Sequence, residues 1–377
     1  MKRILIAGGG IAGLSAAYFT AAKSSEPLSI TLIEAGSNWG GKIVTDRADG
    51  FVIEGGPDTF VVTKPWGAQL CRDLGIADRL KGTNPETRKT YILKNGKLHE
   101  LPGGLTMMIP TEVWPMLRTG LLSWPAKTRM GLDFILPPAG LNGDETLGGF
   151  VTRRLGRSAY ENLIEPLMSG IYAGDGDSLS LQSTFPYLRS LELKHGGLVK
   201  GALALRRERI RKARGNGGHP GPAPGSRSIF LTPQTGLAEI VEALVNELEQ
   251  AGVDLRLSTA LLDLFPEPGG YSAVLEGKEV LHADRVILAT PAFVSAGLAA
   301  GFAPALAAEL CAIEYVSTAT VTLAYRERDL PRPLDGYGYV IPRREGRQAL
   351  ACTWTSTKFP HRAPAGHALL RVFIGRA

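Results

Sequence analysis

Hydrophobic and polar positions at the start of the chain predict a strand, a turn, a helix and a second strand. Ile4–Ala7 is an apolar run that suits a buried parallel strand, and Ser29–Ile33 is a second such run. Between them, glycines at positions 8, 10 and 13 follow the spacing G-x-G-x-x-G, and the second strand ends at an acidic residue, Glu34. A βαβ unit with these features is typical of dinucleotide binding.

Each glycine of this turn has its own steric role in that interpretation. Gly8 permits the tight turn, Gly10 lets the backbone approach a pyrophosphate, and Gly13 lets the helix pack close to the sheet. The helix N-terminus offers N–H donors and partial positive charge to the phosphates. Glu34 would accept hydrogen bonds from a ribose hydroxyl. The alternative is a glycine-rich turn that binds no ligand.

Two further glycine loops follow Glu34 and bear on which dinucleotide is bound. Gly40-Gly41-Lys42 forms one loop, and Gly55-Gly56-Pro57, which Glu54 precedes, forms the other. Glycine lets the backbone approach a ligand closely, and a nicotinamide enzyme has no evident use for two more such loops. Each loop taken alone is equally consistent with an ordinary turn. Together with Glu34 they favour FAD, whose ribityl chain and ring also need backbone nearby.

Composition and charge fit an enzyme with more than one domain. Of 377 residues, 44% are hydrophobic and 21% are charged, which favours two or more cores over disorder. The net charge of +6 suits an anionic ligand or membrane surface, and without a nucleic-acid-binding motif no nucleic acid partner is expected. Three widely separated cysteines indicate reduced, buried thiols in a cytoplasmic protein. The six histidines show no metal-ligand spacing, so no metal is predicted.

Periodicity and turn residues divide the rest of the chain. Tyr91–His99 is predicted to be a hairpin with a tight turn at Asn95-Gly96. Helices are predicted at 147–155, 160–168 and 237–251, and strands at 254–264 and 318–325. Residues 206–228 combine arginines with a Gly/Pro run and are predicted to be a solvated, flexible linker, the alternative being a nucleic-acid-binding arm.

One segment, Leu105–Leu141, mixes aromatic, apolar and cationic side chains. It contains Met107, Met108, Trp114, Leu121, Leu122, Trp124 and Phe134, with Arg118, Lys127 and Arg129 among them. These residues are predicted to line the core and the pocket of a helical domain, and the alternative is peripheral contact with a membrane. No signal peptide precedes the first strand and no run of eighteen apolar residues exists, so a spanning helix is not expected.

Several segments resemble the flavin amine oxidase superfamily, in its protoporphyrinogen/coproporphyrinogen oxidase branch. Residues 1–59 resemble the superfamily, and Asn162–Asp175 with Leu179–Pro186 closely resembles the branch. Pro102–Pro110 and Arg129–Pro137 also fit, and the similarity covers nearly the whole chain. Val280–Thr290 resembles the last strand of the superfamily's FAD-binding domain, before the chain enters the substrate domain.

The resemblance implies an α/β fold with a Rossmann-like FAD-binding domain of the amine-oxidase (GR2) type, interleaved with an α+β substrate domain and an inserted helical domain. The expected ranges are 1–86 and 229–300 for FAD binding, 87–205 for the substrate and helical insertion, 206–228 for the linker, and 301–377 for the remaining, incomplete part of the substrate domain. The chain ends before the superfamily's last flavin-contacting segment, so it is expected to be truncated and to hold FAD less tightly.

The resemblance also implies an activity. The chain would oxidise a porphyrinogen in haem biosynthesis, either coproporphyrinogen III or protoporphyrinogen IX, with O2 as acceptor and H2O2 as product. No catalytic side chain is predicted, because flavin N5 carries the chemistry. The alternatives are another amine-oxidase-like flavoenzyme (a desaturase or an amine oxidase) and a non-catalytic protein that binds FAD or porphyrin.

Site residues are assigned by the same resemblance. For FAD they are Gly8, Gly9, Gly10, Ile11, Ala12 and Gly13 at the pyrophosphate, Glu34 and Ala35 at the ribose, Gly40, Gly41 and Lys42 in the second loop, Gly56, Pro57, Asp58 and Thr59 beside the flavin ring, and Leu261 near the adenine. Gly170, Ile171 and Ala173 would wall the substrate pocket, with a helix C-cap as the alternative role for Gly170. Thr90 occupies a position where some members hold a propionate-binding arginine, and Arg88 or Lys89 would substitute for it. That departure favours the bacterial branch that acts on coproporphyrinogen.

Overall fold

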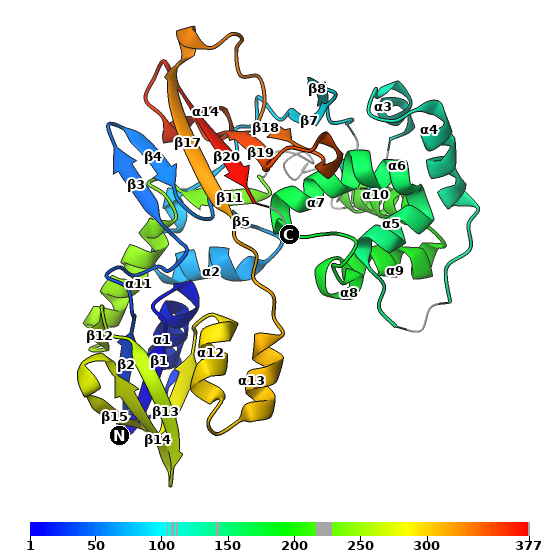
Figure 1. Cartoon of the computed structure of the whole chain (residues 1–377). Coiled ribbons are helices and arrows are strands. Elements are labelled where there is room, and N and C mark those ends of the chain that lie inside the picture. The colour runs from blue at the N-terminus through cyan, green and yellow to red at the C-terminus, as the bar shows by residue number, and fades with distance from the viewer. Residues whose placement is uncertain (104, 107–108, 111, 141–142, 216–227, 376–377) are drawn as a thin grey trace. The chain divides into compact units, whose positions relative to one another are not determined.

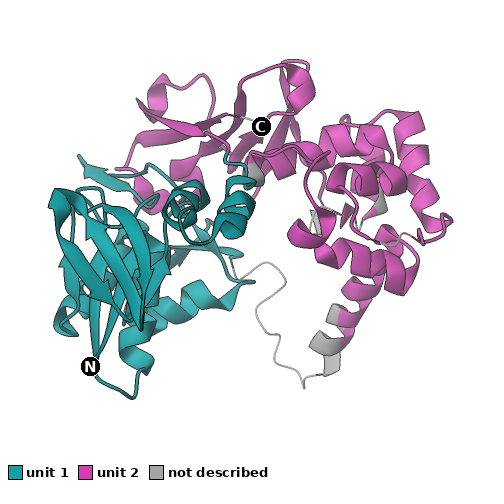
Figure 2. Ribbon diagram, turned by 60° about the horizontal axis from the view of Figure 1, so that its bottom comes forward, with its two compact units in different colours: residues 1–83, 228–315 teal, residues 84–227, 316–377 magenta. Residues whose placement is uncertain are grey.

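The computed structural model describes the chain except residues 104, 107–108, 111, 141–142, 216–227 and 376–377. The described chain forms two compact units (Figure 2). Unit 1 consists of Met1–Thr83 and Ser228–Tyr315, and unit 2 consists of Asn84–Arg227 and Val316–Ala377. Each unit is thus built from two separate stretches of chain. The chain leaves unit 1 after Tyr315, later than the boundary expected at residue 300.

A four-stranded parallel sheet forms the centre of unit 1 (Figure 1). Its strands, in spatial order, are β12 (Asp254–Arg256), β2 (Leu28–Ile33), β1 (Lys2–Ala7) and β16 (Arg285–Leu288). Side chains alternate between the faces of a strand. Ile6 therefore packs in one core with helices α1 (Ile11–Lys23) and α11 (Ala238–Gln250), and Leu5 in another with an antiparallel sheet. The two predicted strands that flank the first glycine turn are confirmed.

The other elements of unit 1 surround this sheet. The antiparallel sheet consists of β13 (Leu261–Glu267), β14 (Gly270–Leu275) and β15 (Val280–Ala283). A hairpin is formed by β3 (Thr45–Ala48) and β4 (Phe51–Glu54), and a small sheet by β5 (Phe60–Val61), β11 (Phe230–Pro233) and β6 (Leu80–Gly82). The remaining helices are α2 (Pro65–Asp73), α12 (Ala292–Ala299) and α13 (Pro304–Cys311).

Two strand predictions in unit 1 are wrong, because each range holds two strands of different sheets. Residues 254–264 divide into β12 and β13, and the left-handed backbone of Ser258 (φ 49°) turns the chain between them. Residues 280–290 divide into β15 and β16 at Asp284. The Asp284 N–H donates to the carbonyl of Arg3, and its carboxylate accepts the Arg3 N–H at 2.7 Å.

A six-stranded sheet forms one part of unit 2. Its strands, in spatial order, are β17 (Ala319–Arg326), β20 (His367–Ile374), β19 (Ala349–Trp354), β18 (Gly338–Val340), β7 (Thr90–Lys94) and β8 (Lys97–Glu100). All neighbours are antiparallel except β18 and β7. The turn between β7 and β8 is at Asn95-Gly96, as predicted. Both residues have positive φ, at 51° and 73°, as tight hairpin turns require.

Helices form the other part of unit 2. They are α3 (Val113–Arg118), α4 (Trp124–Gly131), α5 (Leu147–Leu155), α6 (Arg157–Ala159), α7 (Glu165–Tyr172), α8 (Leu181–Thr184), α9 (Pro186–His195), α10 (Leu198–Gly215) and the short α14 (Thr355–Lys358) beside β20. A π-helical turn, Tyr160–Ile164, joins α6 to α7, and β9 (Leu105–Thr106) pairs with β10 (Ile109–Pro110). The helix predicted at 147–155 is confirmed by α5, and the one at 237–251 by α11, within a residue at each end. That at 160–168 is π-helical in its first half.

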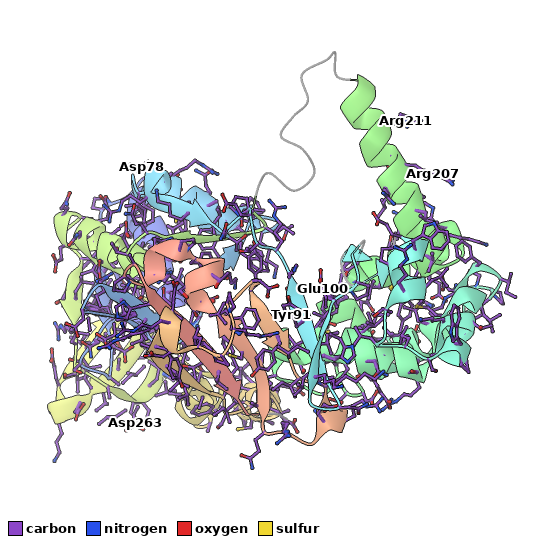
Figure 3. The ribbon with its side chains drawn as sticks, turned by 90° about the horizontal axis from the view of Figure 1, so that it is seen from above. Asp78, Tyr91, Glu100, Arg207, Arg211 and Asp263 are labelled. Carbon is purple, nitrogen blue, oxygen red and sulfur yellow. The ribbon has the colours of Figure 1, made fainter. Side chains whose placement is uncertain are left out.

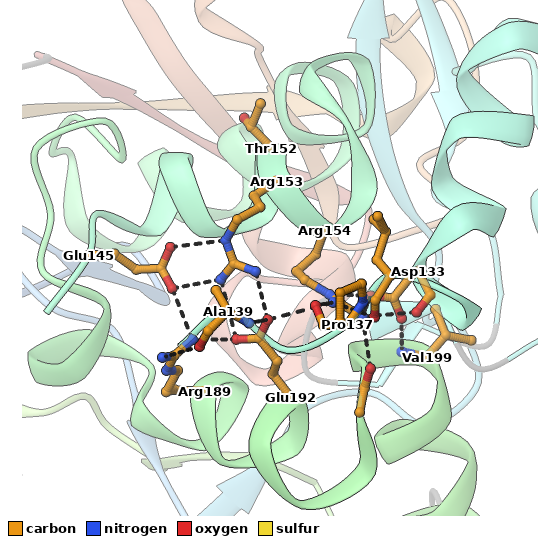
Figure 4. A network of polar contacts seen from close by, with 12 residues as sticks. Asp133, Pro137, Ala139, Glu145, Thr152, Arg153, Arg154, Arg189, Glu192 and Val199 are labelled. Carbon is orange, nitrogen blue, oxygen red and sulfur yellow. Dashed lines mark hydrogen bonds and ion pairs between the residues drawn. The ribbon is translucent and has the colours of Figure 1, made fainter. Parts of the chain in front are cut away.

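A buried polar network joins these helices (Figure 4). Arg154, fully buried, donates to the equally buried Asp133 carboxylate at 2.6 Å and to the carbonyls of Leu136 and Pro137. Arg153 bridges Glu192 at 2.6 Å and Glu145 at 2.8 Å. Burial raises the pKa of Glu192, but hydrogen bonds from Arg153, Ala139 and Arg189 outweigh burial and lower the pKa overall. The stability that Glu192 supplies is therefore present at neutral pH and is lost as pH falls through its lowered pKa.

Two other expectations, one for the linker and one for the cysteines, need correction. Helix α10 continues to Gly215, because arginine and alanine favour helix. The first part of the predicted linker is therefore helical, and Arg207 and Arg211 lie along this helix (Figure 3). The rest of the predicted linker, residues 216–227, lies outside the described chain. Cys71 and Cys352 are buried as expected, whereas Cys311 is exposed at the end of α13.

The mixed segment 105–141 is only partly core. Met116, Leu121 and Met130 are buried, but Trp114 and Trp124 are 70% and 68% exposed and Phe134 is 40% exposed. The prediction that these aromatic residues lie in a core is therefore wrong, and Met107 and Met108 lie outside the described residues. Across the part of the chain that the structure describes, no helix is both long enough and apolar enough to span a bilayer.

Candidate functional site

The first glycine turn connects β1 to α1, and neither Gly8 in the turn nor Gly13 in the helix has room for a side chain. Gly8 has φ +110°, and a Cβ there would lie 2.7 Å from the carbonyl oxygen of Ala289. A Cβ on Gly13 would lie 1.8 Å from the carbonyl oxygen of Gly8. These contacts show why glycine is needed at both positions. Gly8 adopts a backbone conformation that favours glycine, and Gly13 lets the helix pack against the turn.

The N-terminus of α1 follows this turn directly. Gly10 precedes the helix with φ −70° and ψ 176°, no side chain caps the helix, and its first turn contains no acidic residue. A Cβ on Gly10 would have its nearest described heavy atom, Gly41 Cα, at 3.9 Å. Gly10 therefore borders open space, into which the first amides of the helix can donate. That arrangement suits a phosphate group.

Glu34 is held at the end of β2 by backbone donors. Its Oε2 accepts the Gly9 N–H at 2.7 Å, and its Oε1 accepts the Gly36 N–H at 2.7 Å. Each carboxylate oxygen has a further lone pair available, so the group can still accept from two hydroxyls. This geometry fits the ribose of an adenine dinucleotide.

The second glycine loop meets the first, and the third meets the second. The Gly40 N–H donates to the carbonyl of Gly9 at 2.9 Å, and a Cβ on Gly41 would lie 3.1 Å from Gly10 Cα. A Cβ on Gly56 would lie 1.8 Å from the carbonyl oxygen of Lys42. The three loops predicted from the sequence therefore form one continuous backbone surface in unit 1.

The other predicted FAD residues lie on or beside this surface. Lys42, the last residue of the second loop, is exposed. In the third loop Thr59 donates its hydroxyl to Asp58 at 3.0 Å. Leu261 begins β13, close to the Glu34 loop, because the N–H of Thr259 donates to the Glu34 carbonyl at 2.8 Å. The contacts of Ala35, Pro57 and these residues with a cofactor remain predictions.

The predicted substrate residues lie in unit 2, at the end of α7. A Cβ on Gly170 would lie 3.5 Å from Val340 Cγ1, so this helix packs on β18. Ala173, with φ +51°, is the residue that ends the helix, so Gly170 is not its C-cap. Ile171 belongs to the same last turn.

Sequence reasoning missed two residues of the unit 1 site. Trp39 lies over Gly9, since a Cβ there would be 2.4 Å from its ring. Glu54, next to the third loop, is buried and accepts hydrogen bonds from the Thr45 hydroxyl and the Leu237 N–H. Its position before a Gly-Gly pair is the only signal that the sequence offered, because Leu237 lies 183 positions away in the chain.

Comparison with known proteins agrees with this geometry. Residues 11–377 match the family model described as flavin containing amine oxidoreductase. The chain is 40% identical to coproporphyrinogen III oxidase of Bacillus subtilis, covering 100% of this chain and 78% of that protein. It is 30% identical to chloroplastic protoporphyrinogen oxidase 1 of Arabidopsis thaliana, covering 98% and 69% respectively. A crystal structure of a candidate protoporphyrinogen oxidase from Exiguobacterium sp. 255-15 matches with a TM-score of 0.84 at 36% identity, covering 100% of this chain and 77% of that one.

The chain therefore belongs to the flavin amine oxidase family, in the porphyrinogen oxidase group that these relatives define. The predicted α/β fold, family and FAD cofactor are confirmed. The residues present fit FAD. Open space borders Gly10 at the N-terminus of α1, and the Glu34 carboxylate is hydrogen-bonded to the neighbouring residue, Gly9. Bound there, FAD would supply a two-electron acceptor.

We expect Glu34→Gln to weaken FAD binding by roughly ten- to a hundredfold, because a charge-assisted acceptor is lost and the new NH2 group faces a backbone N–H. Titration of the apoprotein with FAD measures the effect. Glu26→Gln is the matched control, since Glu26 is an exposed carboxylate of the same unit that pairs with Lys2. An unchanged dissociation constant for Glu34→Gln would contradict the role assigned to Glu34.

Proposed function

We propose that this chain oxidises coproporphyrinogen III to coproporphyrin III, with O2 as the acceptor. The observation that carries the proposal is the 40% identity, over the whole chain, to a protein named coproporphyrinogen III oxidase. Removal of six hydrogens from the macrocycle corresponds to three two-electron steps, each of which reduces one O2 to H2O2. Protoporphyrinogen IX is the second substrate candidate, because relatives of 30% identity are named for it.

In this proposal Gly170, Ile171 and Ala173 wall the substrate pocket. Two features of their surroundings support a functional role. Ala173 adopts a left-handed conformation, which costs a residue other than glycine about 1–3 kcal/mol and is frequent at functional sites. A π-helical turn, Tyr160–Ile164, precedes α7, and such turns often occur at functional sites.

The substrate carboxylates need cationic partners. Thr90, at the hairpin position expected to contact a propionate, begins β7 and carries no charge. Its two basic neighbours are Arg88 and Lys89. The Asp335 carboxylate lies 3.0 Å from the Lys89 ammonium group and compensates the charge of Lys89. We propose Arg88 as the better of the two candidates for a propionate contact.

The proposal is tested by following porphyrin fluorescence and H2O2 after adding either porphyrinogen, prepared under reducing conditions, to the FAD-loaded chain. We expect turnover of coproporphyrinogen III to exceed that of protoporphyrinogen IX. Turnover of a simple amine such as putrescine would favour an amine oxidase instead. A yellow, FAD-bound chain without turnover of any of these would favour a non-catalytic flavin-binding protein.

We also propose a cytoplasmic location with peripheral contact at an anionic membrane, through α3, α4 and the residues after them. Trp114, Trp124 and Ile135 expose most of their surface. Arg118 lies over the Trp114 ring, and Lys127 lies 4.8 Å from the centre of the Trp124 ring. Exposed aromatic residues beside cations suit the headgroup region of a bilayer.

Co-sedimentation with vesicles tests this contact. We expect binding to vesicles that contain phosphatidylglycerol, weaker binding to pure phosphatidylcholine, and loss of binding in Trp114→Ala/Trp124→Ala. Equal recovery of the parent and the double variant in the supernatant would reject the contact.

A further inference from the structure

Glu54 is a buried carboxylate between two elements that are distant in the chain. It is the last residue of β4 and is only 5% exposed. Its Oε2 accepts the Thr45 hydroxyl at 2.6 Å, and its Oε1 accepts the N–H of Leu237 at 2.9 Å. Thr45 lies on the partner strand of the hairpin, and Leu237 directly precedes α11. One carboxylate therefore ties both strands of the hairpin to the start of this helix.

The Thr45 hydroxyl extends this connection to the next amide of the helix. It accepts the N–H of Ala238 at 3.0 Å while it donates to Glu54. Gly236, with φ +109°, lies so close that a Cβ there would be 2.3 Å from Thr45 Cγ2. The hairpin base and the helix start are therefore in direct contact. A negative charge is also favourable at a helix N-terminus.

The third glycine loop begins at the residue after Glu54. The Gly55 N–H donates to the carbonyl of Val44 at 2.7 Å, and Gly56 packs against the carbonyl of Lys42. A displacement of Glu54 would thus move the third loop and, through Lys42, the second.

We propose that Glu54 is a positioning residue for FAD, which fixes the Gly55–Thr59 loop by anchoring it to the N-terminus of α11 through Thr45, Leu237 and Ala238. The inference rests on the assignment of this loop to the flavin-ring side of the cofactor. Glu54 acts through the loop and takes no part in the reaction itself. The adenine end of the site, at Gly8–Gly13 and Glu34, has separate backbone contacts.

The chain offers a matched control on the same two elements. Glu242 of α11 pairs with Arg47 of β3 at 2.8 Å, but the two side chains are 53% and 38% exposed. An exposed ion pair contributes little. Glu242→Gln therefore removes a carboxylate that joins the same hairpin to the same helix, without touching the buried connection.

The test compares FAD with ADP, which is the cofactor without its flavin and ribityl parts. Apoprotein is titrated with FAD, and ADP affinity is obtained by competition. We expect Glu54→Gln to weaken FAD about tenfold and Glu54→Ala about a hundredfold, from the loss of hydrogen bonds to a charged group. ADP affinity should stay within about twofold of the parent, and Glu242→Gln should leave both constants unchanged.

A second measurement separates positioning from simple stabilisation. The visible absorption bands of the bound flavin depend on the surroundings of the ring, so they should shift in Glu54→Gln and not in Glu242→Gln. If Glu54 variants lower only the melting temperature, with unchanged FAD affinity and flavin bands, the positioning role is wrong. Equal weakening of ADP and FAD would also overturn it, because the whole site would then have been disturbed.

Two further comparisons keep the result interpretable. Should Glu54→Ala fail to fold, Thr45→Val removes the bridging hydroxyl in a side chain of similar shape and should give the same selective loss of FAD affinity. Failure of the parent chain to oxidise a porphyrinogen while it binds FAD would reject the proposed function and leave this inference standing. Unaltered FAD binding in the Glu54 and Thr45 variants of an active parent would reject the inference alone.

Discussion

Gly10→Ala is expected to fold as the parent chain does and to lose most of its affinity for FAD. The backbone at Gly10, with φ −70° and ψ 176°, is open to any residue. The nearest described atom to an added Cβ lies at 3.9 Å, which is an ordinary contact. The added methyl group therefore meets no clash within the protein. It would occupy the space where the predicted pyrophosphate contact brings the cofactor against the backbone.

We expect the affinity to fall about ten- to a hundredfold, since overpacking of a close contact costs about 1–3 kcal/mol. Circular dichroism and the melting temperature of the apoprotein should match the parent, while an FAD titration shows the loss. Gly13→Ala is the informative contrast, because its Cβ would lie 1.8 Å from the Gly8 carbonyl and should disturb the fold itself. If Gly10→Ala binds FAD as tightly as the parent, the pyrophosphate does not lie against Gly10.

The parts of the site that were predictable from the sequence depend on local sterics. The glycine spacing follows from contacts within one βαβ unit, and Asn95-Gly96 specifies its hairpin through two residues with positive φ. The sequence predicted that the first and second loops bind the same ligand, but it did not predict that the two loops contact each other. The structure adds direct bonding between them, through the Gly40 N–H and the Gly9 carbonyl.

What the sequence could not supply depends on distant partners. The sequence of residues 254–264 indicates extended chain but not that it crosses from one sheet to another. The role of Glu54 depends on Leu237, 183 positions away. Trp114 and Trp124 were predicted to line the core and the pocket of a helical domain, with membrane contact as the alternative. Nothing local shows that α3 and α4 turn these side chains outward, where Arg118 and Lys127 lie over the rings.

Arg154→Met is expected to destabilise unit 2 by about 3–5 kcal/mol, the cost of leaving a buried charge without its partner. Arg154 and Asp133 are both fully inaccessible, and their contact is 2.6 Å. Removing the guanidinium also leaves the carbonyls of Leu136, Pro137 and Gly196 without this donor (Figure 4). Urea denaturation followed by circular dichroism measures the loss as a lower midpoint.

A second substitution shows whether the buried charge is the cause. Asp133→Asn in the Arg154→Met background removes the stranded charge, while its side-chain oxygen can still accept the N–H of Val199 that Asp133 accepts at 2.8 Å. We expect it to restore part of the lost stability. Arg157→Met is the matched control, because its bond to Glu161 is exposed and should cost less than about 1 kcal/mol. If Arg154→Met and Arg157→Met have equal effects, or if Asp133→Asn makes Arg154→Met worse, lost packing of the long side chain explains the result better than an unpaired carboxylate.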